Sequence, residues 1–549
     1  MKTSAMRGWD RETSLVAQVA ACVSLVAFFY YFQHGEVLLY GDAVAHCNIA
    51  RRVFDSRTPG LLQLGTVWLP LPHLLMIPFI IPIWMWQTGF GASIPSLVSY
   101  VLASAGIFRL LRDALGVENR AARPAAWIAA VIFAANPNLI YLQATAMTEP
   151  LYLALFIWAT VYFAEVVRAV RKKPATDVSA PLTRCGLCLA GACLTRYDGW
   201  FLAAAMAGAA VLADRSQLKT SWRPLAKFVL LAGAAPVLWL AYNAAVYRNP
   251  LEFANGPYSA KAIEQKTSVP GFPPHPGTGA PFTAASYFLK AAQLNLAEGN
   301  WGRLWLLTLL AGTAAVLFRR NLWPLLLLWA PLPFYALSIA YGGVPIFIPP
   351  WWPFSIYNAR YGVELLPAFA AFTAVAAAFA LQQVQVRRAD VAIVAAVFIL
   401  CAGSYAAVWW REPIAFREAW TNSRTRIALE RQLATDLDLL PRDSTILMYL
   451  GDHGGALQRA GIPLRRVIYE GNHRTWVQPR DPDGLWERAL ADPAKFADYV
   501  VAAQGDAVSV TVNRQDLSAL VVLHVMGQPP VTIFAVKKAV SQVHEETGN

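Results

Sequence analysis

The sequence predicts a multi-pass α-helical membrane protein that carries a small C-terminal α/β domain outside the membrane. Of its 549 residues, 56% are hydrophobic and only 15% are charged, whereas soluble domains carry about 25% charged residues. About eleven apolar runs are long enough to cross the roughly 30 Å hydrocarbon core of a bilayer. After residue 410 the charge density rises, and short apolar segments alternate with helical patterns. The surplus of apolar residues therefore faces lipid, and the tail is predicted to fold separately.

Each apolar run is interpreted as one transmembrane helix. The runs lie near residues 14–33, 92–110, 123–141, 148–168, 182–195, 199–213, 224–247, 303–318, 321–341, 359–381 and 389–410. Segment 68–86 is also apolar, but each of its prolines would remove a helical hydrogen bond that lipid cannot replace. We therefore expect juxtamembrane or re-entrant helices there, at the outer surface.

The basic residues lie in short clusters between the runs, which indicates how the chain is oriented. Such clusters mark cytoplasmic loops by the positive-inside rule. They form no continuous basic face with interleaved aromatic residues, so the net charge of +12 does not indicate nucleic-acid binding. We expect an integral protein of the plasma (inner) membrane with a cytoplasmic N-terminus and an extracytoplasmic tail. The clusters are Arg109, Arg112, Arg120 and Arg123; Arg168, Arg171, Lys172, Lys173 and Arg184; Arg215, Lys219, Arg223 and Lys227; Arg319 and Arg320; Arg387 and Arg388.

The predicted organisation has two parts. Residues 1–410 form the transmembrane domain, with a first external loop at 34–91 and a long external loop at 248–302, and residues 411–549 form the extracytoplasmic α/β domain. Alternation of helical and strand patterns in the tail is typical of a small α/β domain. The helical patterns lie at 416–439 and 484–497, and the apolar strands at 445–450, 466–469, 499–503, 521–525 and 531–536.

A glycine-rich stretch follows the first predicted strand of the tail. The sequence Gly451-Asp452-His453-Gly454-Gly455 could approach an anionic group, but it lacks the spacing of a dinucleotide fingerprint. We therefore expect a plain turn there.

Ionisable residues gather where the predicted spans meet the outer surface, and charge near a membrane needs an explanation. Asp42 and His46 are four residues apart, which places them on one face of a helix. Glu149 begins another span, Arg196 occupies a turn between two others, and Arg360 opens a fourth. Acids and bases from four separate elements are thus expected to converge on one interface.

This combination suits the displacement of a phosphate from a lipid-linked substrate. A carboxylate can accept the proton of an attacking hydroxyl, which makes Asp42 and Glu149 the candidate catalytic residues. Arginine forks bind phosphate oxygens and stabilise a negative leaving group, so Arg196 and Arg360 are the candidate donor-phosphate ligands. Lys261, in the long external loop, is a further candidate, with a solvated lysine as the alternative. The expected substrate groove comprises His46, Trp68, His73, Tyr197, Asp198 and Tyr361.

Structural roles are the alternatives for several of these residues. Asp198 could pair with Arg196 and cap the next helix, and Glu149 could stabilise a helix N-terminus through the dipole. His46 could join Asp42 and Glu149 in a metal site or be an ordinary hydrogen-bonded histidine, which is the simpler interpretation.

No complete metal site is predicted from the cysteines. Cys185 and Cys188 have the spacing of half a zinc site, but no second pair completes it. We expect them to pack as small hydrophobic residues.

The ordered motifs over residues 14–380 resemble those of a known family. Asp42 follows the first span, Glu149-Pro150 begins a later one, and the motifs Thr195-Arg196-Tyr197-Asp198-Gly199 and Arg360-Tyr361-x-x-x-Leu365-Leu366-Pro367 come after it. This pattern is similar to the polyprenyl-phosphate-sugar-dependent glycosyltransferases of the GT-C fold, in particular to the bacterial protein-mannosyltransferase-like and aminoarabinose-transferase-like group.

The resemblance implies a polyprenyl-phosphate-linked monosaccharide donor and transfer on the external face to an acceptor glycan, lipid or protein. It also implies a catalytic Asp42 and phosphate-binding Arg196 and Arg360. Many family members carry an acidic pair in the first loop, whereas Asp42 is followed by Ala43. No cofactor is therefore assigned, and a divalent metal ion stays an alternative.

The leading hypothesis is a glycosyltransferase that acts by single displacement with inversion, because one base is evident and no second nucleophile is. A transporter or flippase of lipid-linked sugar is the alternative, although it would place polar residues near the middle of the membrane. A sensor with a membrane anchor is a third option, but about eleven spans exceed what anchoring needs. The sequence leaves the sugar and the acceptor open.

Overall fold

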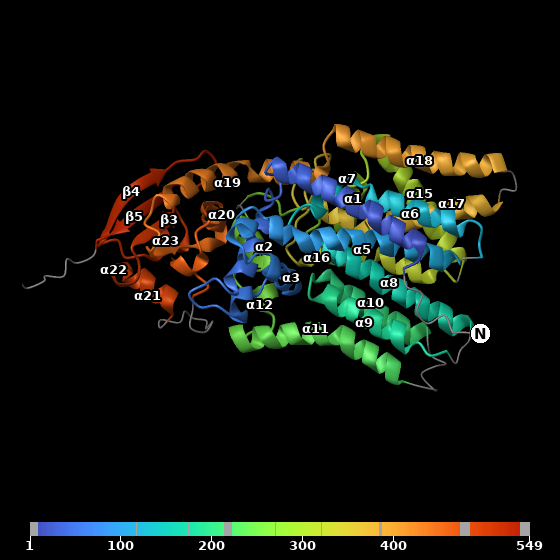
Figure 1. Ribbon diagram of the computed structural model, residues 1–549, viewed down its shortest axis with the longest axis horizontal. Helices are drawn as coiled ribbons and strands as arrows, with labels where there is room; N and C mark the ends of the chain where they lie inside the picture. The colour runs from blue at the N-terminus through green and yellow to red at the C-terminus, as the bar shows by residue number, and fades with distance from the viewer. Residues whose placement is uncertain are drawn as a thin grey trace, which may run out of the picture.

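The computed structural model describes residues 9–537, apart from residues 117 and 320 and segments 173–175, 214–221, 269–270, 384–386 and 473–483. A bundle of long helices occupies one end of the elongated molecule, and a smaller part that contains a sheet occupies the other (Figure 1). Lys173, Arg215, Lys219 and Arg320 of the basic clusters lie outside the described residues.

The predicted apolar runs are all helical in the structure. In chain order they form α1 (Arg11–Gln33), α5 (Phe90–Leu115), α6 (Ala122–Ala134), α7 (Pro137–Gln143), α8 (Glu149–Lys172), α9 (Ser179–Cys193), α10 (Asp198–Ala213), α11 (Arg223–Tyr247), α15 (Gly299–Phe318), η3 (Trp323–Trp329), α16 (Pro331–Tyr341), η4 (Ala359–Leu365), α17 (Leu366–Gln383) and α18 (Arg387–Trp410). Among the described residues, 8 helices are long and apolar enough to cross a membrane, or 9 if the bent pair α6 and α7 is one span. Helices α9 and α10 have only 15 and 16 residues. The prediction of a multi-pass helical membrane protein is confirmed, and the predicted number of about eleven spans stays a prediction.

The bend between α6 and α7 has a local cause. Asn136 caps α7, because its side chain accepts a hydrogen bond from the backbone N–H of Leu139 at 3.0 Å, and Pro137 is the first residue of that helix. Proline favours this position because its missing N–H would have no helical partner there. The chain turns by 60°, so the short α7 leads toward the start of α8.

Short helices lie between the bundle and the sheet, where α2 and α3 appear in Figure 1. They are α2 (Gly41–Arg52), η1 (Leu61–Leu64), α3 (Leu71–Met76), η2 (Ile77–Phe79) and α4 (Ile83–Gln87) from the first loop, and α12 (Glu252–Asn255), α13 (Ala260–Thr267) and α14 (Pro281–Leu294) from the later one. Segment 68–86 forms short helices and no continuous span, in agreement with the prediction. Pro70 and Pro82 stand at the N-caps of α3 and α4.

The tail has the predicted alternation of helices and strands. Its elements are α19 (Ile414–Asp438), β1 (Ile446–Met448), α20 (Leu450–Ala460), η5 (Leu464–Arg466), β2 (Val467–Ile468), α21 (Leu485–Ala491), α22 (Pro493–Phe496), β3 (Tyr499–Ala503), α23 (Ala507–Thr511), β4 (Leu517–Leu523) and β5 (Val531–Val536). The sheet has the order β2-β1-β3-β5-β4. Strand β1 is parallel to β2 and β3, whereas β5 is antiparallel to β3 and β4. A small α/β region is therefore confirmed, and the domain boundary at residue 410 stays a prediction.

The expected turn at residues 451–455 is wrong, because these residues belong to α20. Their glycines permit close packing against α19. A Cβ atom on Gly455 would lie 2.1 Å from Oε1 of Glu430, and one on Gly454 would lie 3.4 Å from the side chain of Asn48. The glycine-rich composition thus serves helix packing.

Arg112 and Arg123 of the first basic cluster lie at the opposite end of the bundle from Asp42. Arg112 forms an ion pair with Asp10, and Nε of Arg123 lies 2.6 Å from Oε1 of Glu12, so both arginines sit beside the start of α1. Asp42 follows the other end of α1. The structure therefore separates the two groups by the length of a spanning helix.

Helices α15 and α17 approach closely at Gly312. A Cβ atom on this residue would lie 1.8 Å from the backbone oxygen of Phe372. No rotamer change relieves a clash with backbone, so any side chain there must push the helices apart. Because η4 and α17 form a continuous path from Arg360 into the bundle, this contact also supports the polar site described below.

We predict that Gly312→Ala lowers the free energy of unfolding by about 1–3 kcal/mol, the usual cost of overpacking. The matched control is Gly233→Ala in α11, where an added Cβ meets nothing within 4 Å. Thermal unfolding of the detergent-purified variants measures both effects. Equal stabilities of the two variants would contradict the close contact.

Candidate active site

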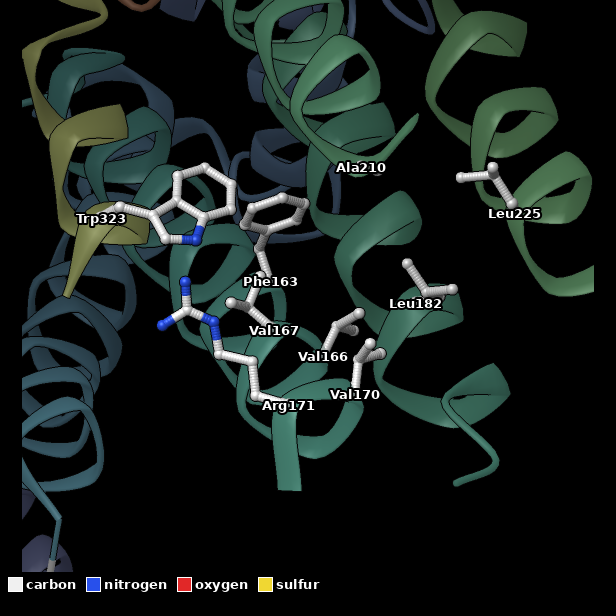
Figure 2. A pocket seen from close by; sticks show the side chains of 9 residues that line it. All are labelled: Phe163, Val166, Val167, Val170, Arg171, Leu182, Ala210, Leu225 and Trp323. Atoms are coloured by element: carbon white, nitrogen blue, oxygen red, sulfur yellow. The ribbon is translucent and has the colours of Figure 1, made fainter. Parts of the chain in front are cut away.

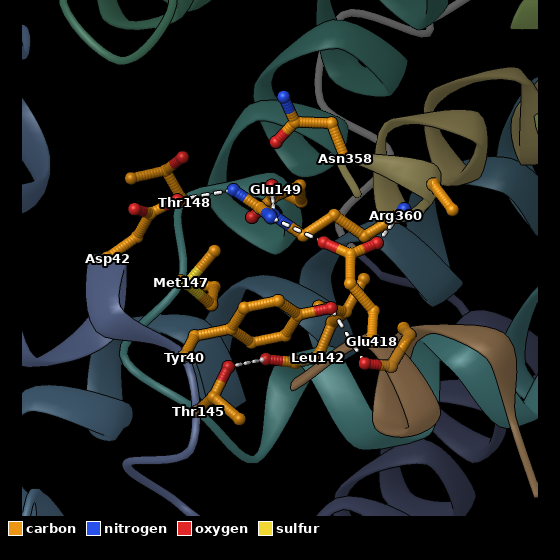
Figure 3. A network of polar contacts seen from close by, with 12 residues as sticks. Tyr40, Asp42, Leu142, Thr145, Met147, Thr148, Glu149, Asn358, Arg360 and Glu418 are labelled. Carbon is orange, nitrogen blue, oxygen red and sulfur yellow. Dashed lines mark hydrogen bonds and ion pairs between the residues drawn. The ribbon is translucent and has the colours of Figure 1, made fainter. Parts of the chain in front are cut away.

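The candidate site centres on the buried guanidinium of Arg360, which has three carboxylate partners. Nη2 contacts Oδ2 of Asp42, Nε lies 3.2 Å from Oε1 of Glu149, and Nη1 lies 2.7 Å from Oε1 of Glu418. Figure 3 shows the guanidinium between these three side chains. A buried charge of this kind requires close ion pairs, because desolvation costs several kcal/mol.

The local structure explains where two of these carboxylates stand. Asp42 lies in the first turn of α2, and Glu149 is the first residue of α8. A negative charge at a helix N-terminus interacts favourably with the helix dipole. Arg360 is the second residue of η4, and the N-cap Asn358 just before this helix has a left-handed backbone with φ of 54°. The helix starts thus direct all three side chains into one space.

Arg196 forms a second centre in the turn between α9 and α10. Its Nη2 lies 2.9 Å from Oε1 of Glu364 and 2.7 Å from the Tyr335 hydroxyl, and its Nε lies 3.3 Å from Oδ2 of Asp198. Asp198 also accepts a hydrogen bond from the backbone N–H of Gly199 at 3.0 Å. Asp198 therefore makes the two contacts that a structural role predicts: it pairs with Arg196, and it caps α10.

Two residues join the centres into a single cluster. Oε1 of Glu149 lies 3.2 Å from Arg360 and 3.5 Å from Arg196. The ring of Tyr361 lies 4.8 Å from the guanidinium of Arg360 and 5.0 Å from that of Arg196, within cation–π range. The predicted convergence of Asp42, Glu149, Arg196 and Arg360 is therefore present in the fold.

Carboxylates outnumber guanidiniums in this cluster. Arg196 and Arg360 face five acidic side chains, those of Asp42, Glu149, Asp198, Glu364 and Glu418. Both arginines therefore already have carboxylate partners, so an anionic ligand would have to compete with them. The side chain of Asp42 is 40% exposed, whereas those of Glu149 and Glu418 are 0% and 1% exposed. Asp42 is the partner of Arg360 that an incoming ligand can displace.

No group of three or more His, Cys, Asp or Glu side chains in the described part of the chain is arranged to hold a metal ion.

His46 and His73 form a buried pair beside the cluster. Nδ1 of His46 lies 2.9 Å from Nε2 of His73, and the ring of Trp68 lies 4.8 Å from that of His46. Burial lowers the pKa of His46 to about 4, although nearby Asp42 acts in the opposite direction. Burial also lowers the pKa of His73 well below its usual value. Both imidazoles are thus neutral near pH 7 and share one hydrogen bond.

Tyr197 of the predicted groove and Lys261, the further phosphate candidate, differ in their surroundings. Tyr197 donates a hydrogen bond to the carbonyl of Val67 at 3.0 Å, and its ring stacks on that of Phe253 at 4.8 Å. Tyr197 thus connects the first external loop to α12. Lys261 lies on α13 with an exposed side chain, and none of the ion pairs of the arginine cluster includes it.

The sequence reasoning missed Glu364 and Glu418. Glu364 follows Arg360 by one helical turn within an apolar run, and an acid in such a run is itself a signal of function. Glu418 lies in an ordinary amphipathic pattern after the last span, where no motif marks it. Its approach to Arg360 depends on how α19 packs against the bundle.

A small cavity lies among α8, α9, α10, α11 and η3 (Figure 2). Its volume is about 80 Å³, and Phe163, Val167, Leu182 and Trp323 are among its mostly apolar lining residues. Glu149 begins α8, whereas the α8 residues at the cavity follow it along the helix. The cavity is therefore separate from the arginine cluster.

Sequence comparison supports the predicted resemblance over part of the chain. Residues 70–240 match the profile of a family described as dolichyl-phosphate-mannose-protein mannosyltransferase. A comparison with curated protein sequences gave no match.

Solved structures show the same fold over nearly the whole chain. ArnT from Cupriavidus metallidurans bound to undecaprenyl phosphate is 15% identical, with a TM-score of 0.57 over 94% of this chain and 97% of that chain. The apo state of the same protein gives a TM-score of 0.54 at 14% identity, over 95% of this chain and 98% of that chain. An oligosaccharyltransferase from Archaeoglobus fulgidus gives a TM-score of 0.49 at 12% identity, over 89% of this chain and 69% of that chain. The first two likenesses confirm the GT-C fold that the motifs predict.

The histidine pair predicts a pH dependence of stability. The pKa of about 4 for folded His46 lies below the ordinary value of 6.5, so the unfolded state binds more protons between these pH values. The contribution of neutral, buried His46 to the free energy of unfolding is therefore complete above pH 6.5, and it is lost as the pH falls toward 4. His46→Gln should reduce this loss of unfolding free energy by about 3 kcal/mol.

Denaturant unfolding at pH 6.5 and pH 4 measures the effect, with the exposed His34→Gln as the control. If His46→Gln and His34→Gln lose the same stability over this interval, burial of a neutral His46 is refuted.

Proposed function

We propose that this protein is a polyprenyl-phosphate-dependent membrane glycosyltransferase of the GT-C type. It transfers a monosaccharide from a polyprenyl-phosphate donor to an acceptor hydroxyl on the extracytoplasmic face. The observation that carries the proposal is the direct contact between the Asp42 carboxylate and the Arg360 guanidinium. It brings a candidate base and a candidate phosphate ligand together within one cluster.

Donor binding and activation of the base are coupled in this proposal. The donor phosphate binds Nη2 of Arg360 and displaces Asp42, the most exposed of the three carboxylates around that guanidinium. The Asp42 carboxylate is then free to accept a proton. The base therefore becomes available only when the leaving group is in place.

The reaction is a single displacement. Asp42 accepts the proton of the acceptor hydroxyl, whose oxygen forms a bond to the anomeric carbon while the bond from that carbon to the phosphate oxygen breaks. Arg360 and Arg196 stabilise the polyprenyl phosphate that leaves. Attack from the face opposite the leaving group inverts the anomeric configuration. Glu149 touches both arginines and holds them in one orientation.

Two further findings support this class of donor. The family profile that matches residues 70–240 is described by its use of dolichyl-phosphate mannose. ArnT, the structural neighbour with a TM-score of 0.57, was solved with undecaprenyl phosphate bound. A transporter would need polar residues near the middle of the membrane, whereas this cluster lies at helix starts beside the external loops.

We also propose the orientation in an inner membrane. The basic end of the bundle, at the start of α1, is cytoplasmic, and the arginine cluster, the first external loop, the loop at 248–302 and the tail are extracytoplasmic. The basis is the positive-inside rule. Lys261, on the long loop, is retained as a candidate contact for a donor that enters from that side.

Replacement of the proposed base gives the first functional prediction. Asp42→Asn keeps the size of the side chain but removes the proton acceptor, so turnover should fall roughly 10²–10⁴-fold. Binding of polyprenyl phosphate should persist or tighten, because the phosphate no longer displaces an anion from Arg360. Donor binding and sugar transfer are measured on the same detergent-purified sample.

The matched control is Asp55→Asn in the same external loop, where the carboxylate pairs with Arg51 at 2.7 Å. It should keep the turnover of its folded fraction. Transfer by Asp42→Asn at the rate of the unaltered protein would exclude Asp42 as the base and leave Glu149 as the next carboxylate to test.

Topology gives an independent prediction. Reporter fusions after Arg184 and Arg320 should report a cytoplasmic location, and a fusion after Gly455 should report an extracytoplasmic one. A cytoplasmic reporter at Gly455 would place the arginine cluster on the wrong face for the proposed reaction.

A further inference from the structure

We infer that Glu418 is a positioning residue, which holds Arg360 so that one edge of its guanidinium, Nη2, is presented to the donor phosphate. This inference rests on the proposed function. It assigns a part of the donor site to α19, the helix that follows the last membrane span.

The contacts of Glu418 fix both ends of Arg360. Its Oε1 accepts a hydrogen bond from Nη1 at 2.7 Å, and its Oε2 accepts one from the backbone N–H of Arg360 at 3.1 Å. The carboxylate thus binds the start and the tip of the same long side chain. With 1% of its side chain exposed, Glu418 exchanges these bonds with water only when the packing opens.

The remaining neighbours of Arg360 leave one edge for a ligand. Nε donates to Glu149 at 3.2 Å, and the rings of Tyr40 and Tyr361 lie 4.7 and 4.8 Å from the guanidinium. Nη2 points to Asp42, whose side chain is 40% exposed. A phosphate can therefore approach Arg360 along the edge that Asp42 now occupies.

The same helix also holds the segment that leads to Asp42. The hydroxyl of Tyr40 donates a hydrogen bond to the carbonyl of Ala415 at 2.7 Å, and Nη2 of Arg426 donates to the carbonyl of Leu39 at 2.7 Å. Helix α19 is thus bonded to the chain on both sides of the site. It aligns Arg360 with the turn that presents Asp42.

A positioning role and a purely electrostatic role of Glu418 predict opposite changes in phosphate affinity for the same substitution. Glu418→Gln removes one negative charge from a cluster with surplus carboxylates. If Glu418 acted only through its charge, phosphate binding would tighten. If it positions Arg360, the Gln amide cannot accept from both N–H groups, the guanidinium becomes mobile, and phosphate binding weakens.

The experiment measures binding of undecaprenyl phosphate to the full detergent-purified chain, together with kcat and KM for a polyprenyl-phospho-sugar. We expect Glu418→Gln to weaken phosphate binding about 10-fold, the effect of roughly 1.4 kcal/mol. KM for the donor should rise more than kcat falls, because the base is retained.

A second variant and a control keep the test decisive if Glu418→Gln fails to fold. Glu418→Asp keeps the charge but shortens the side chain. Weaker phosphate binding by this variant would therefore come from the changed position of the carboxylate and not from a change of charge. The control is Glu298→Gln, which loosens α19 elsewhere, since Glu298 lies 2.5 Å from Arg417 and 3.1 Å from Arg411. It should bind undecaprenyl phosphate as the unaltered protein does.

Unchanged or tighter phosphate binding by folded Glu418→Gln, or unchanged binding by Glu418→Asp, would overturn the inference while the proposed function stands. Equal weakening by Glu298→Gln would also overturn it, because the effect would then come from a loosened helix. If the unaltered protein itself does not bind undecaprenyl phosphate, the proposed function fails, and the inference fails with it.

Discussion

A buried guanidinium must be paired, and the pairing of Arg360 is the constraint on which the rest of this site depends. Burial of one arginine without partners would cost several kcal/mol. Its carboxylate partners come from the first external loop, the start of α8 and the tail helix α19. Elements far apart in the sequence are therefore held together at one end of the bundle (Figure 3).

The surplus of carboxylates gives the cluster a second property. In the proposed reaction, both arginines have anionic partners before the donor arrives, so the donor phosphate competes with a carboxylate. The exchange conserves the charge around Arg360, so it costs less than the binding of an anion beside unpaired carboxylates. It also leaves the displaced Asp42 close to the leaving group, where a base is needed. Preorganisation of this kind stabilises charge as it develops in a transition state.

The sequence predicts the convergence of the motif residues because topology alone places them. Once the spans and their direction are assigned, Asp42, Glu149, Arg196 and Arg360 must lie at the same end of the bundle. The strands of the tail are equally predictable, since β3 and β5 are short apolar runs bounded by turn residues. Glu418 and the packing role of Gly455 could not be predicted, because both depend on how α19 packs against other helices, which no local pattern encodes.

The central claim is that a sugar leaves its lipid phosphate at this site. In the most direct measurement, the purified protein in lipid vesicles is incubated with a panel of polyprenyl-phospho-sugars and acceptor candidates. The masses of the lipid products are then determined by mass spectrometry. The account predicts that one donor is converted to free polyprenyl phosphate with loss of a single sugar, and that Asp42→Asn slows this conversion roughly 10²–10⁴-fold. A donor that crosses the vesicle membrane with its sugar still attached, and with no free polyprenyl phosphate formed, would contradict the account and indicate a transporter.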